Sequence, residues 1–535
     1  MMKSSFLYIL APLRLPPLSQ PTMSSHRDSI DKSNVLASPT VSVAGATDSG
    51  DSAHYIKDLD YTPEEEKAVI SILDTRLFPA VLLTTFVLNM DRTNLSNAIS
   101  DGLPKDLGFT INTVNTAIAI YSVVFSLACF SGAVMSKLVG PSRWIPILMA
   151  SWGIVTLAHA AIKDTAGFMC VRVFIALTEG GVIPSTLIYL GGFYKGTELT
   201  TRLAWFWGIQ SIASAVSGLM ASGLLQLRGR GGLEGWKWLF LVDGIITMAV
   251  SVFIWFYLPR SVAQTSGGLR GFKPWFNERQ IQIAFTRVIR DDISKRKYES
   301  RPTRNDFLNA AKDLTLWGHF LITVLILTPT NPLGTYLPTV IKSFDFNVFV
   351  SNALTAPPYV LQCIISITLI RHAEKVGQRA LHGAFGSAWQ MVGWIILRAM
   401  PHSAPRGAKY FGAVFLASWP YNHPLNIGWM SENSGSIGQR TVSSGGVIFA
   451  ANIYGTWASQ IYQASDAPDF KRGNSANIAV AGAAVISWIA QRQYYLHLNR
   501  VRAQKYAELT EAEKTVEDRE KEVKGNKSLS FKFVT

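Results

Sequence analysis

The sequence predicts an all-α membrane protein with twelve transmembrane helices in two pseudo-symmetric six-helix halves. Only 16% of its 535 residues are charged, and the mean hydropathy is +0.19. Soluble globular proteins carry about 25% charged residues. Apolar runs of about 20 residues, the length that crosses a bilayer, recur along the chain. A polar, basic stretch at 259–313 separates six such runs from six others.

The two predicted halves occupy residues 76–258 and 314–496. In the first half we expect spans near 76–98, 113–136, 143–162, 166–190, 203–225 and 237–258. In the second half we expect spans near 314–334, 350–370, 380–399, 408–430, 441–463 and 475–496.

Three further segments are predicted to be cytosolic. Residues 1–75 are rich in Ser, Pro, Asp and Thr and predict a disordered N-terminal tail. Residues 259–313 form a linker, in which PWFNERQIQIAFTRVI has the pattern of an amphipathic helix on the membrane surface. Residues 497–535 form a C-terminal tail.

The distribution of Lys and Arg sets the expected orientation. The linker at 259–313 alone carries twelve of them, which places it and both termini in the cytosol by the positive-inside rule. We expect the plasma membrane. The net charge of +14 is explained by topology and contact with anionic lipid, and no nucleic-acid motif accompanies it.

The chain has only three cysteines, Cys129, Cys170 and Cys363, and all fall inside apolar runs. This placement predicts buried small side chains, with no disulfide, metal or cofactor.

An internal repeat supports the division into halves. GAVMSKLVGPSRW (Gly132–Trp144) follows the second span, and IRHAEKVGQRAL (Ile370–Leu381) follows the eighth. Both place a basic residue shortly before a glycine turn and then another Arg. Equivalent positions in two halves are typical of a duplicated transporter fold.

Six motifs in order resemble the major facilitator superfamily. More narrowly, they resemble its anion:cation symporter branch, in the fungal group of allantoate, nicotinate, pantothenate and biotin permeases. The motifs are MDRTNLSNA (Met90–Ala98), VRVFIALTEGGVIPSTLIYLGGFY (Val171–Tyr194), GWKWLF (Gly235–Phe240), YLPTVIKSFDF (Tyr336–Phe346), NALTAPPY (Asn352–Tyr359) and YQASDAPDFKRG (Tyr462–Gly473). The resemblance covers about residues 70–500 and implies the major facilitator fold.

The chain departs from the pattern of that branch in its gating loops. Phe130-Ser131-Gly132 stands where the branch usually has Pro-Ser-Asn, Ser136 replaces a common Asp, and Gln439-Arg440 replaces Lys-Arg. The resemblance implies gating or conformational roles for Lys137, Arg143, Glu374, Lys375, Arg379 and Arg440.

Charged residues inside the predicted spans are the main functional signal. If the first helix starts near Arg76 on the inside, a rise of 1.5 Å per residue puts Asp91 about 22 Å deep. The fourth helix runs inward from about residue 166, which puts Arg172 about 9 Å and Glu179 about 20 Å from the outer face. Asp91 and Arg172 then lie at a similar depth. Arg172 and Glu179 are two turns apart on one helix face, which should point into the bundle.

Two interpretations of Asp91, Arg92, Arg172 and Glu179 stay open. They could form a buried ion-pair network that only fixes helix packing. Alternatively, Arg92 and Arg172 bind an anionic substrate, since the guanidinium fork matches a carboxylate, while Asp91 and Glu179 carry the coupling proton. The resemblance implies the second. We expect Asp91 to be tied to Arg172.

Weaker polar signals also fall within the spans. The candidate substrate-binding residues are Asn94, Tyr121, Gln210, Tyr359, Asn426 and Asn433; Asn97, Asn331 and Asn452 could also line a cavity. Each could instead form an interhelical hydrogen bond. We expect His159 and His319 to be packing residues, and Asp243 to form a structural ion pair.

The predicted function is secondary active transport: proton-coupled symport, by a monomer, of a small organic anion such as a vitamin or ureide. The alternatives are a nutrient receptor without transport, or a sodium-coupled or facilitative carrier. No HExxH, GxSxG or phosphate-loop motif occurs, so neither an enzyme nor an ATP-driven pump is predicted.

Overall fold

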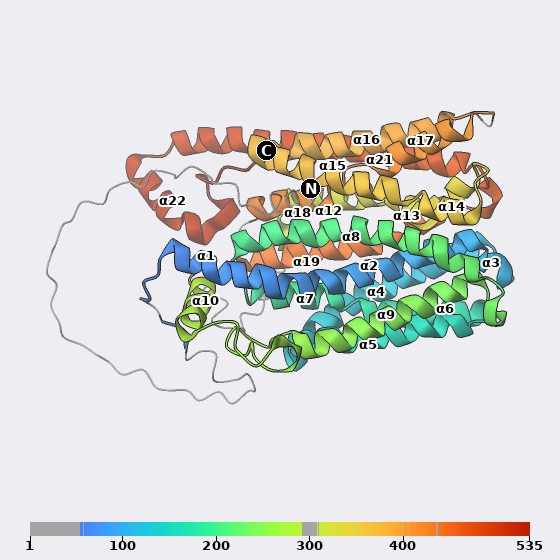
Figure 1. The fold of residues 1–535 in the computed structure, drawn as a ribbon. Coiled ribbons are helices and arrows are strands. Elements are labelled where there is room, and N and C mark those ends of the chain that lie inside the picture. Colours follow the sequence, from blue (N-terminus) through green and yellow to red (C-terminus); the bar gives the residue numbers. More distant parts are fainter. Residues whose placement is uncertain (1–53, 57, 292–307, 309, 402, 435–436) are drawn as a thin grey trace, which may run out of the picture. The chain divides into compact units, whose positions relative to one another are not determined.

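The computed structural model describes residues 54–56, 58–291, 308, 310–401, 403–434 and 437–535. All regular elements within these residues are helices (Figure 1). The predicted all-α class is confirmed, and a helix or a series of helices lies at each predicted span.

The first six spans are formed by long helices, three of which are built from shorter pieces. They are α1 (Pro63–Ile72) continuing through η3 (Leu73–Leu77) into α2 (Phe78–Asp101); α4 (Ile111–Val139); α5 (Pro141–Ala158) with η4 (His159–Ala161); α6 (Thr165–Glu179) with α7 (Val182–Gly191); α8 (Gly196–Leu224); and α9 (Gly235–Tyr257).

The last six spans are more often interrupted. They are α12 (Leu314–Leu327) with α13 (Thr330–Lys342); α14 (Val348–Ala353) with α15 (Ala356–Val376); α16 (Arg379–Ala399); α17 (Arg406–Ala417) with α18 (His423–Asn433); α19 (Ile437–Ile453) with α20 (Gly455–Ala458); and α21 (Lys471–Ala507).

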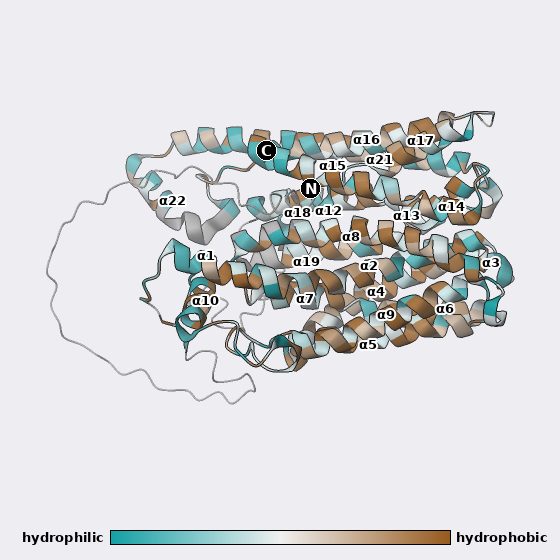
Figure 2. Cartoon of the chain, viewed as in Figure 1, coloured by the Kyte–Doolittle hydropathy of each residue, from teal (hydrophilic) through white to brown (hydrophobic). Residues whose placement is uncertain are grey.

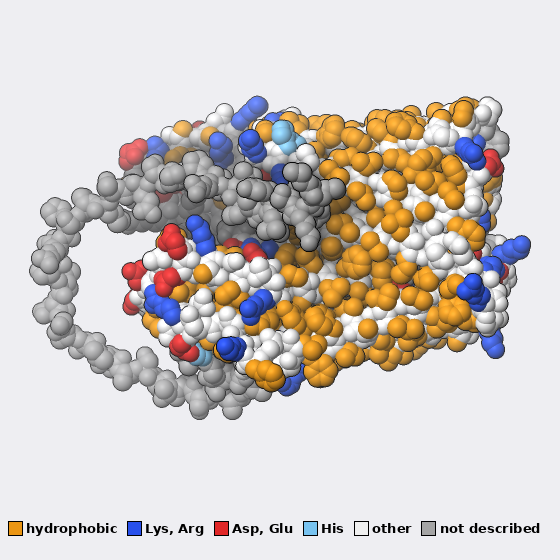
Figure 3. All heavy atoms as spheres, in the orientation of Figure 1, with side chains coloured by type: hydrophobic (Ala, Val, Ile, Leu, Met, Phe, Trp, Pro, Cys, Tyr) orange, Lys and Arg blue, Asp and Glu red, His pale blue; other side chains and the backbone are white. Residues whose placement is uncertain are grey.

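Nine helices among the described residues are long and apolar enough to cross a membrane. The other three predicted spans correspond to α16, the α17–α18 pair and the α19–α20 pair. On the face drawn in Figure 3, apolar side chains cover the middle of the bundle and charged side chains gather at its two ends; Figure 2 shows the hydropathy of each residue along the same ribbon. This is the distribution that a bilayer requires of a helical bundle.

Helix breaks occur at proline, which cannot donate a backbone hydrogen bond, and at glycine, which has no side chain. Pro329 lies at the junction of α12 and α13, and Pro420 lies in the gap between α17 and α18. Gly180 and Gly181 separate α6 from α7. A Cβ on Gly180 would lie 2.6 Å from the Cβ of Ala128, so α4 can approach this break only because a glycine stands there.

The linker helix α10 (Glu278–Asp291) was predicted to lie with its apolar face on a membrane surface, but that face packs against protein. Its apolar residues Ile281, Ile283 and Ala284 are buried in the cluster that also holds Val69 of α1. The fully buried Arg287 anchors α10, with Nη1 2.7 Å from Glu198 Oε1. The expectation was wrong because an amphipathic pattern does not show whether its apolar face meets lipid or protein.

The chain is helical on both sides of the predicted halves. Within the predicted tail 1–75, residues 1–53 lie outside the described residues, and α1 already begins at Pro63. Beyond 496, α21 continues to Ala507 and α22 (Glu511–Lys524) follows. Phe533 is buried, with its ring 4.7 Å from that of Tyr495, so the last residues pack onto the second half.

The bundle has two different ends (Figure 1). The tail end carries α1, α10 and α22, and the loop end carries α3 (Leu103–Asp106) and α14. At the loop end the halves are joined by Asn115, whose Oδ1 accepts a hydrogen bond from Tyr336 (2.6 Å) and whose Nδ2 donates one to the carbonyl of Tyr462 (2.5 Å). Lys342 Nζ also reaches the carbonyl of Ser100 at 2.8 Å. The loop end is therefore closed.

Candidate functional site

Helix α2 presents its two adjacent charges to different surroundings. Successive residues of an α-helix point about 100° apart, because one turn takes 3.6 residues. Arg92 lines the central cavity, whereas Asp91 is buried behind it against α5 and α9. The adjacent charges therefore belong to two different sites.

The first site is a buried ion pair between α2 and α6. Arg92 Nε donates to Glu179 Oε2 at 3.1 Å, and the hydroxyl of Tyr121 donates to the same oxygen at 2.6 Å. Glu179 is only 1% exposed, and Arg92 also stacks over the ring of Phe125, 4.7 Å from its centroid. One Nη atom of Arg92 is buried without a hydrogen-bond partner. The pair can therefore exchange partners when another acceptor enters.

Glycines bring Glu179 to this position. Glu179 ends α6 and is followed by Gly180 and Gly181. A Cβ on Gly132 of α4 would overlap the backbone of Gly181, so α4 and the α6–α7 break approach this closely only because glycines stand there. Gly132 is one of the positions at which the chain departs from the branch pattern. Here its lack of a side chain permits the contact that holds Glu179 beside Tyr121.

Arg172 is the second cation of the cavity, and it lacks a direct countercharge. Its guanidinium lies 4.9 Å from the ring centroid of Tyr121. Its Nε is buried without a hydrogen-bond partner, and no carboxylate of a described residue lies within 4.0 Å. The predicted tie to Asp91 is not formed. Helical depth places the two residues at one level, but it does not determine the direction in which each side chain points.

Asp91 lies in a second cluster with Asp243. Asp91 Oδ2 accepts hydrogen bonds from Trp152 Nε1 (2.8 Å) and from the hydroxyl of Thr247 (3.2 Å). Asp243 accepts a hydrogen bond from Asn94 Nδ2. The expected ion pair of Asp243 was wrong, since no basic group of a described residue lies within 4.0 Å of it.

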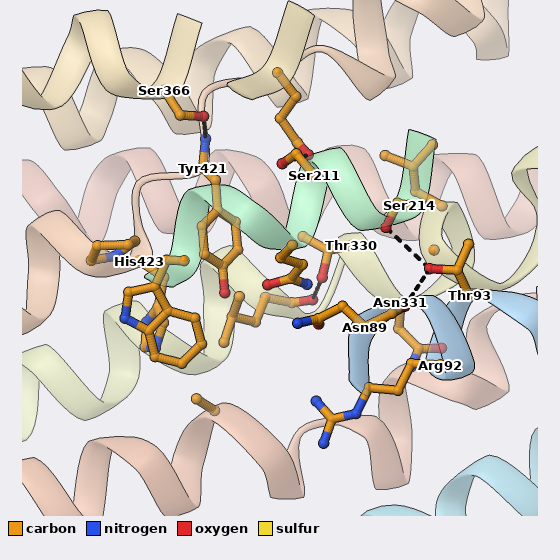
Figure 4. A pocket seen from close by; sticks show the side chains of 18 of the residues that line it. Asn89, Arg92, Thr93, Ser211, Ser214, Thr330, Asn331, Ser366, Tyr421 and His423 are labelled. Atoms are coloured by element: carbon orange, nitrogen blue, oxygen red, sulfur yellow. Dashed lines mark hydrogen bonds between the residues drawn. The ribbon is translucent and has the colours of Figure 1, made fainter. Parts of the chain in front are cut away.

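The central cavity has a volume of about 440 Å³ and lies between the two halves. Five predicted substrate-binding residues line it: Arg92, Tyr121, Arg172, Gln210 and Tyr359. Asn331 and Asn452 line it as well. The cavity extends to Arg371 and Glu374 in the last turns of α15, near the tail end. Figure 4 shows Arg92 and Asn89 on one side of this space and Tyr421 and His423 on another.

Three predicted binding residues lie outside the cavity lining. Asn94 bonds to Asp243 and accepts from the hydroxyl of Ser217 at 2.9 Å. The side chain of Asn426 is held by His319 Nδ1 at 2.7 Å. Asn433 exchanges two hydrogen bonds with the backbone of Val534, at 2.8 and 3.0 Å.

The two histidines are packed, as predicted. His159 stacks on Phe240 with ring centroids 4.3 Å apart. His319 is buried between Asn426 and Tyr495, whose hydroxyl lies 2.8 Å from its Nε2.

Aromatic side chains of the cavity were not predicted. Besides the predicted tyrosines, the lining includes Trp205, Trp207, Trp419, Tyr421, His423 and Tyr454. Two sequence signals point to them: the Trp-Phe-Trp run at 205–207, and the helix break SWPYNHP at 418–424. The cavity is thus cationic on the side of α2 and α6 and aromatic on several others.

The predicted gating residues occupy equivalent loops of the two halves. Lys137 and Arg143 are exposed at the α4–α5 connection, and Lys375 is exposed at the α15–α16 connection, where Glu374 lines the cavity. Arg379 pairs with Glu432 of α18. The side chain of Arg440 lies outside the described residues.

Comparisons with known proteins agree with this architecture. The family model of the Major Facilitator Superfamily matches residues 81–461. An uncharacterized transporter of Saccharomyces cerevisiae is 28% identical over 89% of this chain and 88% of its own length. The MFS-type transporter cnsO of Penicillium expansum is 27% identical over 85% of this chain and 92% of its own. A solved D-xylose-proton symporter has a TM-score of 0.59 at 12% identity, covering 78% of this chain and 96% of its own.

Proposed function

The chain belongs to the major facilitator superfamily, and from that premise we propose that it carries a small organic anion across the membrane together with a proton. The observation that carries the proposal is the arrangement in one cavity of Arg172, without a carboxylate partner, and Arg92, paired with the buried Glu179. A transporter rather than an enzyme is indicated by the family and by the named transporters among its relatives.

An anion fits the charge of the cavity. Arg92 is paired with Glu179, which leaves Arg172, among the described residues, without a carboxylate within hydrogen-bonding distance until one enters the cavity. A buried charge without a partner is costly, and a carboxylate that takes both prongs of a guanidinium fork offsets that cost. Arg suits this role because it stays protonated at every physiological pH.

A proton couples to the anion through exchange of partners. An anion that binds Arg92 competes with Glu179 for the guanidinium. A buried carboxylate that loses its cation favours the protonated form, since burial penalises the charge. Glu179 would then take up a proton when the anion binds and release it when the anion leaves. The D-xylose-proton symporter is an example of proton coupling among proteins of this fold.

The aromatic lining narrows the range of substrates that fit the cavity. Aromatic lining residues such as Trp205, Tyr359 and Tyr421 offer apolar contact area that a flat or ring-bearing molecule can cover. A cavity of about 440 Å³ lies in the range of small-molecule sites. A compact organic acid with a planar body fits better than a flexible peptide.

Transport proceeds by alternating access between two six-helix halves, residues 76–258 and 314–496. The loop end is closed by Asn115, and the cavity extends toward the tail end. Rocking of the halves about the cavity would open the loop end and close the tail end. We propose that the tail end faces the cytosol of a plasma-membrane protein, because α10, the described helix of the basic linker, lies at this end.

The experiment is uptake of a panel of radiolabelled organic acids into cells or proteoliposomes, with and without a protonophore. We expect accumulation of one acid that the protonophore abolishes. In Glu179→Gln, proton-driven accumulation should be lost while exchange of substrate across the membrane survives. The matched control is Glu64→Gln, an exposed acid in the first turn of α1.

Three outcomes would contradict parts of the proposal. Accumulation that follows the sodium gradient rather than pH would show that sodium, not the proton, is the coupling ion. Binding without uptake would indicate a receptor. A preference for neutral or cationic compounds would contradict the anion.

A further inference from the structure

A second acidic cluster lies behind the cavity, between α2 and α9. Asp91 is 7% exposed and Asp243 is fully buried. Neither lines the cavity, and Glu179 belongs to the separate site with Arg92. The symport mechanism above uses neither aspartate.

The hydrogen bonds of the two aspartates are reciprocal. Asp91 on α2 accepts from Thr247 on α9, and Asp243 on α9 accepts from Asn94 on α2. Each acid therefore accepts a hydrogen bond from a residue that lies one turn away from the other acid, on the other acid's helix. Because Thr247 and Asp243 lie one turn apart on α9, and Asp91 and Asn94 one turn apart on α2, these two hydrogen bonds bring the two carboxyl groups close together.

The hydrogen-bond donors around Asp91 and Asp243 are all neutral, and they do not reach every carboxylate oxygen. Trp152 and Thr247 donate to one oxygen of Asp91, and Asn94 donates to one oxygen of Asp243. Asp243 Oδ1 is buried without any donor. No basic group of a described residue lies within 4.0 Å of either acid. Two facing carboxylates have only acceptors to offer each other, so a hydrogen bond between them requires a proton.

Two adjacent buried anions are strongly unfavourable. Like charges a few ångströms apart repel, and burial adds a desolvation penalty to each. Carboxyl pairs in other proteins avoid this by sharing one proton between two acids. A proton held between Asp91 and Asp243 would also supply a donor to this region, where Asp243 Oδ1 is buried without one.

We propose that Asp91 and Asp243 form a proton-binding carboxyl pair that holds one shared proton, separate from Glu179. This goes beyond the proposed function, since it requires neither substrate nor transport.

The surrounding charges are consistent with one shared proton. Arg172 and Glu179 on α6 interact electrostatically with Asp91, and Glu179 also with Asp243. His159 packs against α9 through Phe240, and Arg92 is the neighbour of Asp91 on α2. With one shared proton, the pair carries a single negative charge. With His159 neutral, the two positive charges of the arginines then balance the negative charges of Glu179 and of the pair. An entering anion would disturb this balance, and the pair is a second place where a compensating proton could bind.

The test is infrared spectroscopy of the full-length chain in lipid nanodiscs without substrate. A protonated carboxyl group gives a C=O stretching band that shifts in deuterium oxide. We expect one component of this band at neutral pH to disappear in Asp243→Asn and equally in Asp91→Asn, because either change leaves a single carboxylate with an amide donor beside it. Glu179→Gln and the exposed-site control Asp345→Asn should retain it.

The two variants make the result decisive. Loss of the component in only one of them would place the proton on a single acid and overturn sharing. Retention in both would overturn the pair as a proton site. Should one variant fail to fold, the other still removes half of the pair, and retention of the component there refutes the proposal. Uptake assays are not involved, so failure of the proposed symport would leave this result intact.

Discussion

Arg92 and Glu179 form an ion pair of 3.1 Å between the first and fourth spans, and the hydroxyl of Tyr121 shares the same carboxylate oxygen at 2.6 Å. Arg92 therefore reaches the cavity while holding an acid that is itself 1% exposed. The arginine can contact an entering molecule, and the acid can respond to it without contact. This separation of roles yields predictions for each residue around the pair.

Arg172 should determine affinity for the anion. Hydrogen bonds to charged groups contribute about 1.5–3 kcal/mol, and 1.4 kcal/mol corresponds to a factor of ten in affinity. We expect Arg172→Gln to weaken substrate binding at least tenfold, measured by equilibrium binding to purified protein. Arg172→Lys should restore only part of it, since an ammonium lacks the planar fork.

The control for this loss is Arg230→Gln, an exposed arginine in the α8–α9 connection. Equal affinity of Arg172→Gln and Arg230→Gln would show that Arg172 does not contact the substrate.

Tyr121→Phe should change the pH dependence of transport more than affinity. The phenylalanine ring preserves the stacking with Arg172, but the hydroxyl that donates to Glu179 is lost. A donor to a carboxylate contributes to the balance between its charged and protonated forms, so its removal should alter the coupling of uptake to the proton. We expect the pH profile of uptake to change while substrate affinity is kept, measured in proteoliposomes at fixed membrane potential. An unchanged profile would exclude this hydrogen bond from coupling.

Asn115 should stabilise the closed loop end. Its side chain bonds to Tyr336 and Tyr462 of the second half, and alanine removes both bonds. We expect Asn115→Ala to populate states with a wider loop end. Spin labels on Lys105 and Asp345, both exposed at this end, would report longer distances in a cysteine-free background.

Thr116→Ala is the matched control, since the exposed Thr116 hydroxyl bonds only to its own helix. Identical distance distributions in both variants would mean that other contacts close the loop end.

The sequence predicts the spans well because their signal is local. Depth arithmetic and helical periodicity also bring Arg92, Arg172 and Glu179 toward one cavity. They fail for Asp91, whose partner depends on the rotation of α2 against α9 rather than on depth. Asn426 resembles a cavity residue in sequence, yet it holds His319, because nothing local distinguishes a binding amide from a packing one.

Glycine contacts hold Glu179 in place, and this gives the last prediction. A Cβ on Gly132 would overlap the backbone of Gly181, and backbone cannot move aside as a flexible side chain can. Overpacking of this kind costs about 1–3 kcal/mol. We expect Gly132→Ala to lower the thermal unfolding temperature of the purified protein and to reduce transport. Gly191→Ala, where no atom lies within 4 Å of the added Cβ, should keep or raise that temperature. Equal unfolding temperatures in the two variants would show that α4 and the α6–α7 break can separate without cost, and that another contact positions Glu179.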